Sequence, residues 1–327
     1  MAKIIIGIHG MGNKPPRETL KMWWKTPIME SLARIDKPKK NINFELFYWT
    51  HYIHPVPLDP EIKDKKHPLY IAQPYWPVYE NFVDQKPSKL REKVLDYLNR
   101  QIDKIFLNDN FTINYSSIND FVIRHFFNDF EAYYNGFCEE QGEQCRIRTA
   151  ICSDLTALLK KHHRKKILLI AHSMGTIIAY EVLTQYASNI PIHTLVTMGS
   201  PLGMPVIKSK IMAEALKQHP QKIELKTPEN VISKWYNLSD LKDKIAFNYK
   251  LGDDFTENSR QVRPTDKIVV NHYEFMGEKN PHKSYGYLST PELAEIVSQF
   301  LGVKRFSPFA WIKKAKNMIG VIRPRPS

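Results

Sequence analysis

The chain has 327 residues with a formal net charge of +13, and 43% of its residues are hydrophobic. A chain of this length can bury a sizeable core, and we expect one large domain with insertions rather than two independent domains. No stretch approaches the roughly eighteen uninterrupted apolar residues of a membrane span, so the sequence predicts no transmembrane helix.

The N-terminal residues predict a strand, a glycine loop and a helix, at residues 3–8, 9–13 and about 18–34. The strand begins at once and leaves no room for a cleavable signal peptide, so we expect a cytoplasmic protein, with export by another route left open. The loop His9-Gly10-Met11-Gly12 lacks the third glycine of a dinucleotide loop and the Lys-Ser or Lys-Thr pair of a phosphate loop, so no cofactor is expected. A loop after an early strand can instead offer a backbone N–H to an oxyanion, and Met11 is the candidate donor.

An inserted cap is predicted after the second expected strand, residues 44–50. The alternation of strands and helices stops there and resumes near residue 146, so we divide the chain into a core of residues 1–51 and 146–302 and a cap of residues 52–145. Residues 52–137 hold 17 of the 38 aromatic residues, which suits either the roof of an apolar pocket or a small core of the cap itself. Helices are expected at about 89–106 and 119–134.

Three cysteines, Cys138, Cys145 and Cys152, cannot all pair, which suits a reducing compartment. Their seven-residue spacing predicts one face of a helix rather than a metal site, because ligands seven residues apart lie about two helical turns distant. No metal is therefore expected.

The most informative segment is Ala171-His172-Ser173-Met174-Gly175. The apolar run of residues 167–170 precedes it and a helix-like stretch, residues 176–183, follows, so Ser173 lies on a turn between a buried strand and a helix. A serine hydroxyl becomes a useful nucleophile when such a turn exposes it beside a base and backbone N–H donors. Met174 is the second candidate oxyanion donor, and His172 is interpreted as packing against the turn.

A catalytic base is expected downstream of Ser173, because acid and histidine follow the serine in chains with this kind of turn. Further strands are predicted at residues 193–198, 231–238 and 267–270, and a last helix at about 291–301. Ligands gather at the carboxyl ends of such strands. His282, in the loop between the last strand and the last helix, is the preferred base, and His272 is the alternative.

Two aspartates follow the strand at residues 231–238, and one of them must accept the imidazole N–H. We prefer Asp243, because it stands immediately before Lys-Ile-Ala, where the chain turns back toward apolar packing. Asp240 is the alternative acid, and it would otherwise bond nearby backbone N–H groups in the turn.

The C-terminal tail, residues 303–327, carries seven Lys and Arg residues and no acid. On a helical wheel Trp311, Ala315, Met318 and Ile322 fall together, which is the pattern of a helix on an anionic membrane surface. A solvated tail whose apolar residues dock on the domain is the alternative.

These motifs resemble those of the lipase and esterase branch of the α/β-hydrolase superfamily, which pairs an H-G-φ-G loop (φ, apolar) with A-H-S-M-G. The likeness covers residues 9–12, 171–175, 199–203, 240–246 and 282–288. The chain is also similar to uncharacterised bacterial hydrolases that have H-G-M-G-N-x-P, D-x-x-x-Y (here Asp129 and Tyr133) and H-x-S-Y-x-Y-L.

That resemblance implies an α/β fold with a mostly parallel central sheet flanked by helices and a helical inserted cap. It also implies one role for each matching residue. Ser173 is the nucleophile, His282 the base and Asp243 the acid, while Met11 and Met174 donate to the oxyanion.

Taken together, the sequence predicts a cofactor-free serine hydrolase that cleaves carboxylic esters through an acyl-enzyme. An acylated lipid is the expected substrate, on the strength of the aromatic cap and the basic tail, and the tail implies an anionic membrane surface as partner. A thioesterase or acyltransferase is an alternative, as is a non-catalytic protein that binds a membrane or a partner on a hydrolase scaffold. Nucleic acid is not expected as a partner despite the positive charge.

Overall fold

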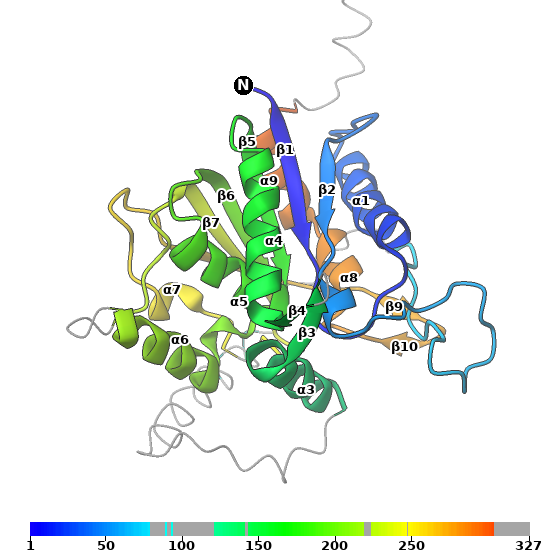
Figure 1. The fold of residues 1–327 in the computed structure, drawn as a ribbon. Coiled ribbons are helices and arrows are strands. Elements are labelled where there is room, and N and C mark those ends of the chain that lie inside the picture. The colour runs from blue at the N-terminus through cyan, green and yellow to red at the C-terminus, as the bar shows by residue number, and fades with distance from the viewer. Residues whose placement is uncertain are drawn as a thin grey trace, which may run out of the picture.

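A six-stranded sheet, parallel throughout, forms the centre of the protein in the order β2-β1-β5-β6-β7-β8 (Figure 1). The computed structural model describes residues 1–78, 89, 93, 121–140, 143–218, 224–246 and 248–303. The strands of the sheet are β1 (Lys3–Ile8), β2 (Phe44–Phe47), β5 (Lys166–His172), β6 (Ile192–Met198), β7 (Val231–Asp240) and β8 (Pro264–Val269). The predicted α/β architecture with a parallel sheet is thus confirmed.

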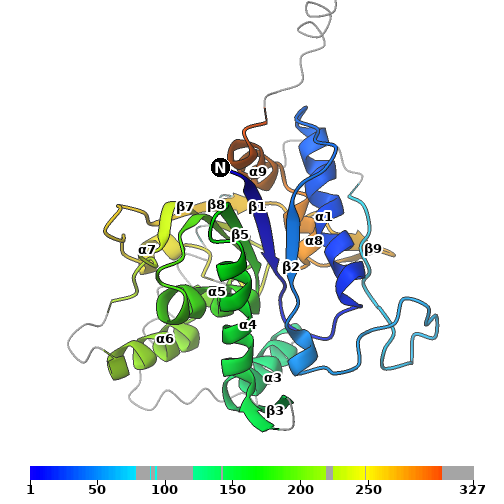
Figure 2. The same ribbon diagram turned by 45° about the horizontal axis from the view of Figure 1, so that its top comes forward.

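Helices cover both faces of the sheet (Figures 1 and 2). One face carries α1 (Arg17–Arg34), α8 (Ser284–Leu288) and α9 (Pro291–Leu301). The other face carries α3 (Phe121–Asn135), α4 (Ile147–Lys161), α5 (Met174–Glu181), α6 (Pro205–Gln218) and α7 (Leu251–Asp254). Within the described residues, no helix has both the length and the apolar character that crossing a membrane requires.

The apolar strand residues explain why two helical layers are needed. Along β1, Ile4 and Ile6 pack into the cluster under α4 and α5, whereas Ile5 packs into the cluster under α1 and α9. Successive side chains of a strand point to opposite faces, so an unbroken isoleucine run is stable only where both faces are covered. Each fully buried side chain of this size contributes roughly 1.5–3 kcal/mol.

The last core helix shows how local signals set a boundary. The Thr290 hydroxyl accepts the N–H of Leu293, and Pro291 occupies the first helical position, where a missing N–H costs nothing. The helix ends at Gly302, which has a φ of 72°. The expected bounds of this helix, about residues 291–301, agree with the structure.

The strand expected at residues 44–50 is shorter than predicted and ends at Phe47. Trp49 and Thr50 turn back toward the first loop, where the Trp49 indole donates to the His9 carbonyl (2.9 Å) and the Thr50 hydroxyl donates to the Gly12 carbonyl (3.0 Å). These contacts start a short 3₁₀ helix, Thr50–Tyr52, in place of further strand. The aromatic and β-branched residues of this segment favour a strand, and for that reason the sequence predicts a longer strand than the structure has.

The cap predicted at residues 52–145 is described only in part. The helix expected at 119–134 is present as α3, whereas the helix expected at 89–106 lies outside the described residues except for 89 and 93. The tail at 303–327 also lies outside them, apart from Val303. The division into core, cap and tail therefore stays a prediction.

The prediction that the three cysteines share a helical face is wrong. Cys138 and Cys145 stand opposite each other on an antiparallel hairpin, β3 (Phe137–Glu140) and β4 (Glu143–Arg146), and only Cys152 lies on a helix, α4. The helix α3 ends before Gly136, where an added Cβ would meet the Ala132 carbonyl at 2.3 Å. The chain then folds back, because seven residues span a two-stranded hairpin as readily as two helical turns.

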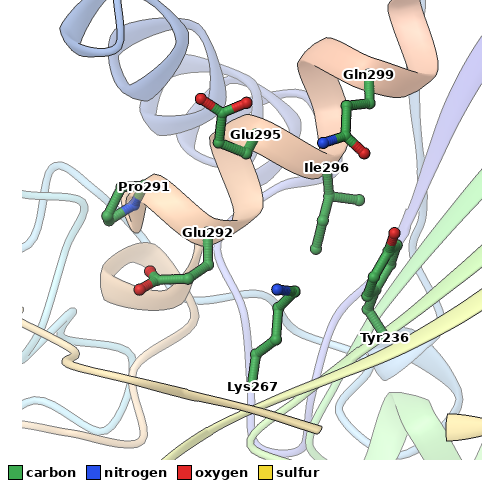
Figure 3. A pocket seen from close by; sticks show the side chains of 7 residues that line it. All are labelled: Tyr236, Lys267, Pro291, Glu292, Glu295, Ile296 and Gln299. Carbon is green, nitrogen blue, oxygen red and sulfur yellow. The ribbon is translucent and has the colours of Figure 1, made fainter. Parts of the chain in front are cut away.

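A cavity of about 320 Å³ lies between α9 and the β7–β8 edge of the sheet (Figure 3). Lys267 of β8, Tyr236 of β7 and Glu292 of α9 border it. Neither Ser173 nor His282 does, so this cavity is separate from the site that the sequence predicts.

Candidate functional site

Ser173 occupies a strained turn between β5 and α5, with φ 54° and ψ −128°. A non-glycine residue in this region costs on the order of 1–3 kcal/mol and persists only where the surroundings hold it. Here the Ser173 N–H donates to the Met198 carbonyl at the end of β6 (3.0 Å). Gly175 lets α5 start close to β1, because an added Cβ would lie 2.6 Å from the His9 carbonyl oxygen.

The turn does not expose the serine as the sequence predicts, since Ser173 has 0% of its surface accessible. The first loop crosses directly against it, and a Cβ added at Gly10 would lie 2.8 Å from the Ser173 Cβ. A substrate therefore reaches the hydroxyl only after the groups that cover Ser173 move.

The structure brings Ser173, His282 and Asp243 into one hydrogen-bonded chain. His282 Nε2 lies 2.9 Å from Ser173 Oγ, and His282 Nδ1 lies 2.8 Å from Asp243 Oδ2. Ser173 follows the carboxyl end of β5, Asp243 that of β7 and His282 that of β8, at one edge of the sheet. An imidazole placed in this way can take a proton from the serine while the carboxylate stabilises the imidazolium.

Asp243 is held by further donors, of which the Ala246 N–H is the most distant, at 3.4 Å from Oδ1. The Ile245 N–H donates to its Oδ1 (2.9 Å), and the Tyr287 hydroxyl donates to its Oδ2 (2.7 Å). Burial, followed by the charge of Asp243, raises the pKa of Tyr287 well above its ordinary value, so the phenol stays protonated and remains a donor. Sequence reasoning did not select Tyr287, although it belongs to the H-x-S-Y-x-Y-L motif.

The two alternative residues lie elsewhere. The Asp240 carboxylate accepts the N–H groups of Asn271 and Lys242, both at 2.7 Å, and burial raises its pKa. This is the turn-bonding role considered for it from the sequence. His272 forms no hydrogen bond to Ser173 or Asp243, so His282 is the imidazole that the fold places at the serine.

His172 does more than pack against the turn. Its Nε2 donates to the His282 carbonyl (2.7 Å), and the two rings lie 4.8 Å apart. Burial lowers the pKa of His172 well below its ordinary value, so the ring is neutral and carries one N–H for this bond. His172 thereby ties the loop of the candidate base to the strand that carries the serine.

The first loop, residues 9–13, is fixed through its carbonyls and one N–H. Lys14 Nζ donates to the Met11 and Gly12 carbonyls, and the Gly12 N–H donates to Asp129 Oδ2. Met11 lies within this loop, and Met174 is the first residue of α5, where N–H groups have no partner inside the helix. The two candidate oxyanion donors are thus on segments adjacent to Ser173.

Helix α3 connects the first loop to the helix of the serine. Asp129 binds the loop, and one turn later the Tyr133 hydroxyl donates to Glu181 Oε2 (2.5 Å) at the end of α5. Arg148 of α4 completes this buried group with two bonds to Glu181, at 2.9 and 3.1 Å. The two residues of the D-x-x-x-Y motif therefore bind the two segments that carry the candidate oxyanion donors.

This fold, with a serine on such a turn, defines an α/β hydrolase. Residues 93–241 match the family model described as PGAP1-like alpha/beta domain, a family of α/β hydrolases, and the six-stranded parallel sheet flanked by helices is consistent with that fold. The matched region contains Ser173 and Met174 but not Met11, Asp243 or His282. No curated protein matches the chain.

Metal ligands do not gather at the site. Across the described parts of the chain, no group of three or more His, Cys, Asp and Glu side chains is arranged to hold a metal ion.

Proposed function

We propose that the protein hydrolyses carboxylic esters through an acyl-enzyme on Ser173. The observation that carries the proposal is the chain of short contacts from Ser173 through His282 to Asp243, at 2.9 and 2.8 Å. The match of residues 93–241 to the PGAP1-like alpha/beta domain supports the same reaction class.

The residues take these roles in the proposed mechanism. His282 Nε2 accepts the hydroxyl proton as Ser173 Oγ bonds to the ester carbonyl carbon, and Asp243 stabilises the imidazolium. The N–H groups of Met11 and Met174 hold the developing oxyanion. His282 then protonates the leaving alcohol. In the second half of the reaction His282 accepts a proton from water as the water oxygen bonds to the acyl carbon, and it returns that proton to Ser173 Oγ as the bond between Oγ and the acyl carbon breaks and the acid leaves.

An acylated lipid is the substrate that we favour, because apolar side chains are exposed close to the candidate base in the chain. Trp76 is 48% exposed and Met276 is 75% exposed, and the Trp76 ring contacts Phe275 at 5.4 Å. Phe275 and Met276 belong to the hairpin β9 (Glu274–Phe275) and β10 (Glu278–Lys279), which ends just before the His282 loop. Exposed apolar clusters of this kind suit an acyl chain or a lipid surface.

A fluorophosphonate probe tests the proposed nucleophile. We expect labelling of the wild-type protein and none of the Ser173→Ala variant, while Ser200→Ala, which removes another buried hydroxyl at the same edge of the sheet, keeps it. Absence of labelling in the folded wild-type protein would favour the non-catalytic alternative.

Substrate class needs a second experiment. We expect kcat/KM to rise with acyl length across p-nitrophenyl esters, as an apolar acyl site requires. A higher rate with thioesters of the same acyl chains would indicate a thioesterase. Transfer of the acyl group to an alcohol added as a competing acceptor would indicate an acyltransferase. A rate independent of acyl length would argue against a lipid substrate.

A further inference from the structure

Lys283 directly follows the candidate base and is held against aromatic rings. Its ammonium group lies 5.4 Å from the ring centre of Tyr285 and 5.9 Å from that of Tyr273, and both rings are buried. The side chain is itself partly buried. No carboxylate of the described residues forms an ion pair with it.

Two other partly buried lysines, Lys37 and Lys208, do have such a partner. Lys37 lies 2.5 Å from Glu295, and Lys208 lies 2.9 Å from Asp254. Removing an ammonium group from water is costly without a nearby negative charge, and contact with ring faces offsets only part of that cost. Lys283 is therefore a partly buried cation without a counter-charge among the described residues, and it directly follows the residue that contacts the candidate nucleophile.

A second cation, Lys14, lies close enough to Lys283 to act on it electrostatically. Lys14 bonds to the carbonyls of Met11 and Gly12, on the loop that crosses Ser173. Burial, followed by the charge of Lys14, lowers the pKa of Lys283 to about 7, so the two ammonium groups repel each other. Asp129 partly offsets the charge of Lys14 but does not reach Lys283.

We propose that Lys283, together with Lys14, binds an anionic group of the substrate, a phosphate or a carboxylate, close to the ester bond that Ser173 attacks. An anion between the two ammonium groups would remove their repulsion and supply the missing counter-charge. Lysine acts on such groups as a compact point charge. This inference rests on the proposed ester hydrolysis and adds the charge of the substrate.

Two pairs of esters, each with one anionic and one neutral member, test the inference at pH 6.5. The lipid pair is 1-oleoylglycerol 3-phosphate and 1-oleoylglycerol, and the soluble pair is mono-p-nitrophenyl glutarate and p-nitrophenyl pentanoate. We expect the wild-type protein to prefer the anionic member at least tenfold in kcat/KM. A preference for the anionic member in both pairs shows that the site binds an anionic group whatever its source. A preference in the lipid pair alone assigns the bound anion to a lipid headgroup.

Lys283→Met should lower the ratio of anionic to neutral kcat/KM at least tenfold, and Lys283→Arg should retain part of it. Lys279→Met is the matched control, because Lys279 is 77% exposed, pairs with Glu274 and lies four residues away. An equal ratio in the wild-type protein and in Lys283→Met, for both pairs, would overturn the inference.

Binding to the Ser173→Ala variant separates this inference from the proposed function. We expect 1-oleoylglycerol 3-phosphate to bind that variant at least tenfold more tightly than 1-oleoylglycerol, and the added Lys283→Met change to abolish the difference. If no ester is hydrolysed and Ser173 is not labelled, the proposed function fails while binding still decides the subsite. Equal binding of the two lipids to Ser173→Ala would reject the subsite alone.

Discussion

The carboxylate of Asp129, on helix α3, accepts the backbone N–H of Gly12, the residue after the candidate oxyanion donor Met11. The pKa of Asp129 is lowered, since its bonds to His54 and Gly12 outweigh the effect of burial. The carboxylate is therefore charged at neutral pH and fixes the peptide planes of the first loop. A residue that precedes the nucleophile by 44 positions thus orients a group proposed to act in the transition state.

Replacing Asp129 should consequently impair catalysis more than substrate binding. We expect Asp129→Ala to lower kcat about tenfold or more with little change in KM. Loss of a whole oxyanion donor costs about 10²–10³ in kcat, whereas this variant keeps the Met11 N–H and only frees the loop that positions it. We expect kcat for a soluble ester, measured by steady-state kinetics, and the affinity for a boronate inhibitor to fall together. Asp154→Ala, which removes a carboxylate bonded to Tyr52 on the surface, is the control. A change confined to KM would contradict this role.

The two aspartates after β7 should differ sharply in their effect on kcat. Asp243→Asn replaces the acceptor of the His282 N–H and should lower kcat by about four orders of magnitude, as removal of the acid does in comparable triads. Asp240→Asn should lower it less than tenfold, because that carboxylate bonds only to backbone N–H groups. Burst kinetics with p-nitrophenyl acetate give both values. A larger loss from Asp240→Asn would exchange the two assignments.

Tyr287 should act through Asp243 rather than on the substrate. Its hydroxyl donates to Asp243 and accepts the Asp240 N–H. Tyr287→Phe therefore removes one hydrogen bond from the Asp243 carboxylate, and the carboxylate then stabilises the imidazolium more strongly. We expect the pKa of the acidic limb of kcat/KM to rise and kcat to fall several-fold. Tyr180→Phe, which loses a buried hydroxyl bonded to the Lys226 carbonyl, should leave the pH profile in place. An unshifted profile in Tyr287→Phe would leave Tyr287 a purely structural residue.

The sequence predicted those features of the site that depend on local strands and turns. The apolar run before Ser173 and the small residues around it determine the turn, and the order of the later loops selects His282. Neither feature indicates that the first loop buries the serine, because that contact joins residues more than 160 positions apart. Asp129, Tyr287 and Lys283 were missed as site residues for the same reason: each acts through a partner that only the folded chain brings near.

The missing counter-charge of Lys283 should also appear in the stability of the protein. Burial and Lys14 lower the pKa of Lys283 to about 7 in the folded state, whereas an unfolded lysine titrates near about 10.4. Below pH 7 both states hold the proton and the cost of the buried charge applies in full. Between pH 7 and about 10 the unfolded chain binds more protons than the folded one, so the stability of the wild-type protein rises with pH through this group.

Lys283→Met lacks this titration and should therefore be more stable than the wild-type protein at pH 6, by an amount that shrinks toward pH 10. The groups facing Lys283 are Lys14, Tyr273, Tyr285 and His172, and all four are present in both proteins, so the difference between the two melting temperatures isolates Lys283. Thermal unfolding followed by circular dichroism at pH 6, 8 and 9.5 measures it. A constant difference across this range would mean that Lys283 is solvated in the folded protein, and the argument for a bound anion would lose its electrostatic basis.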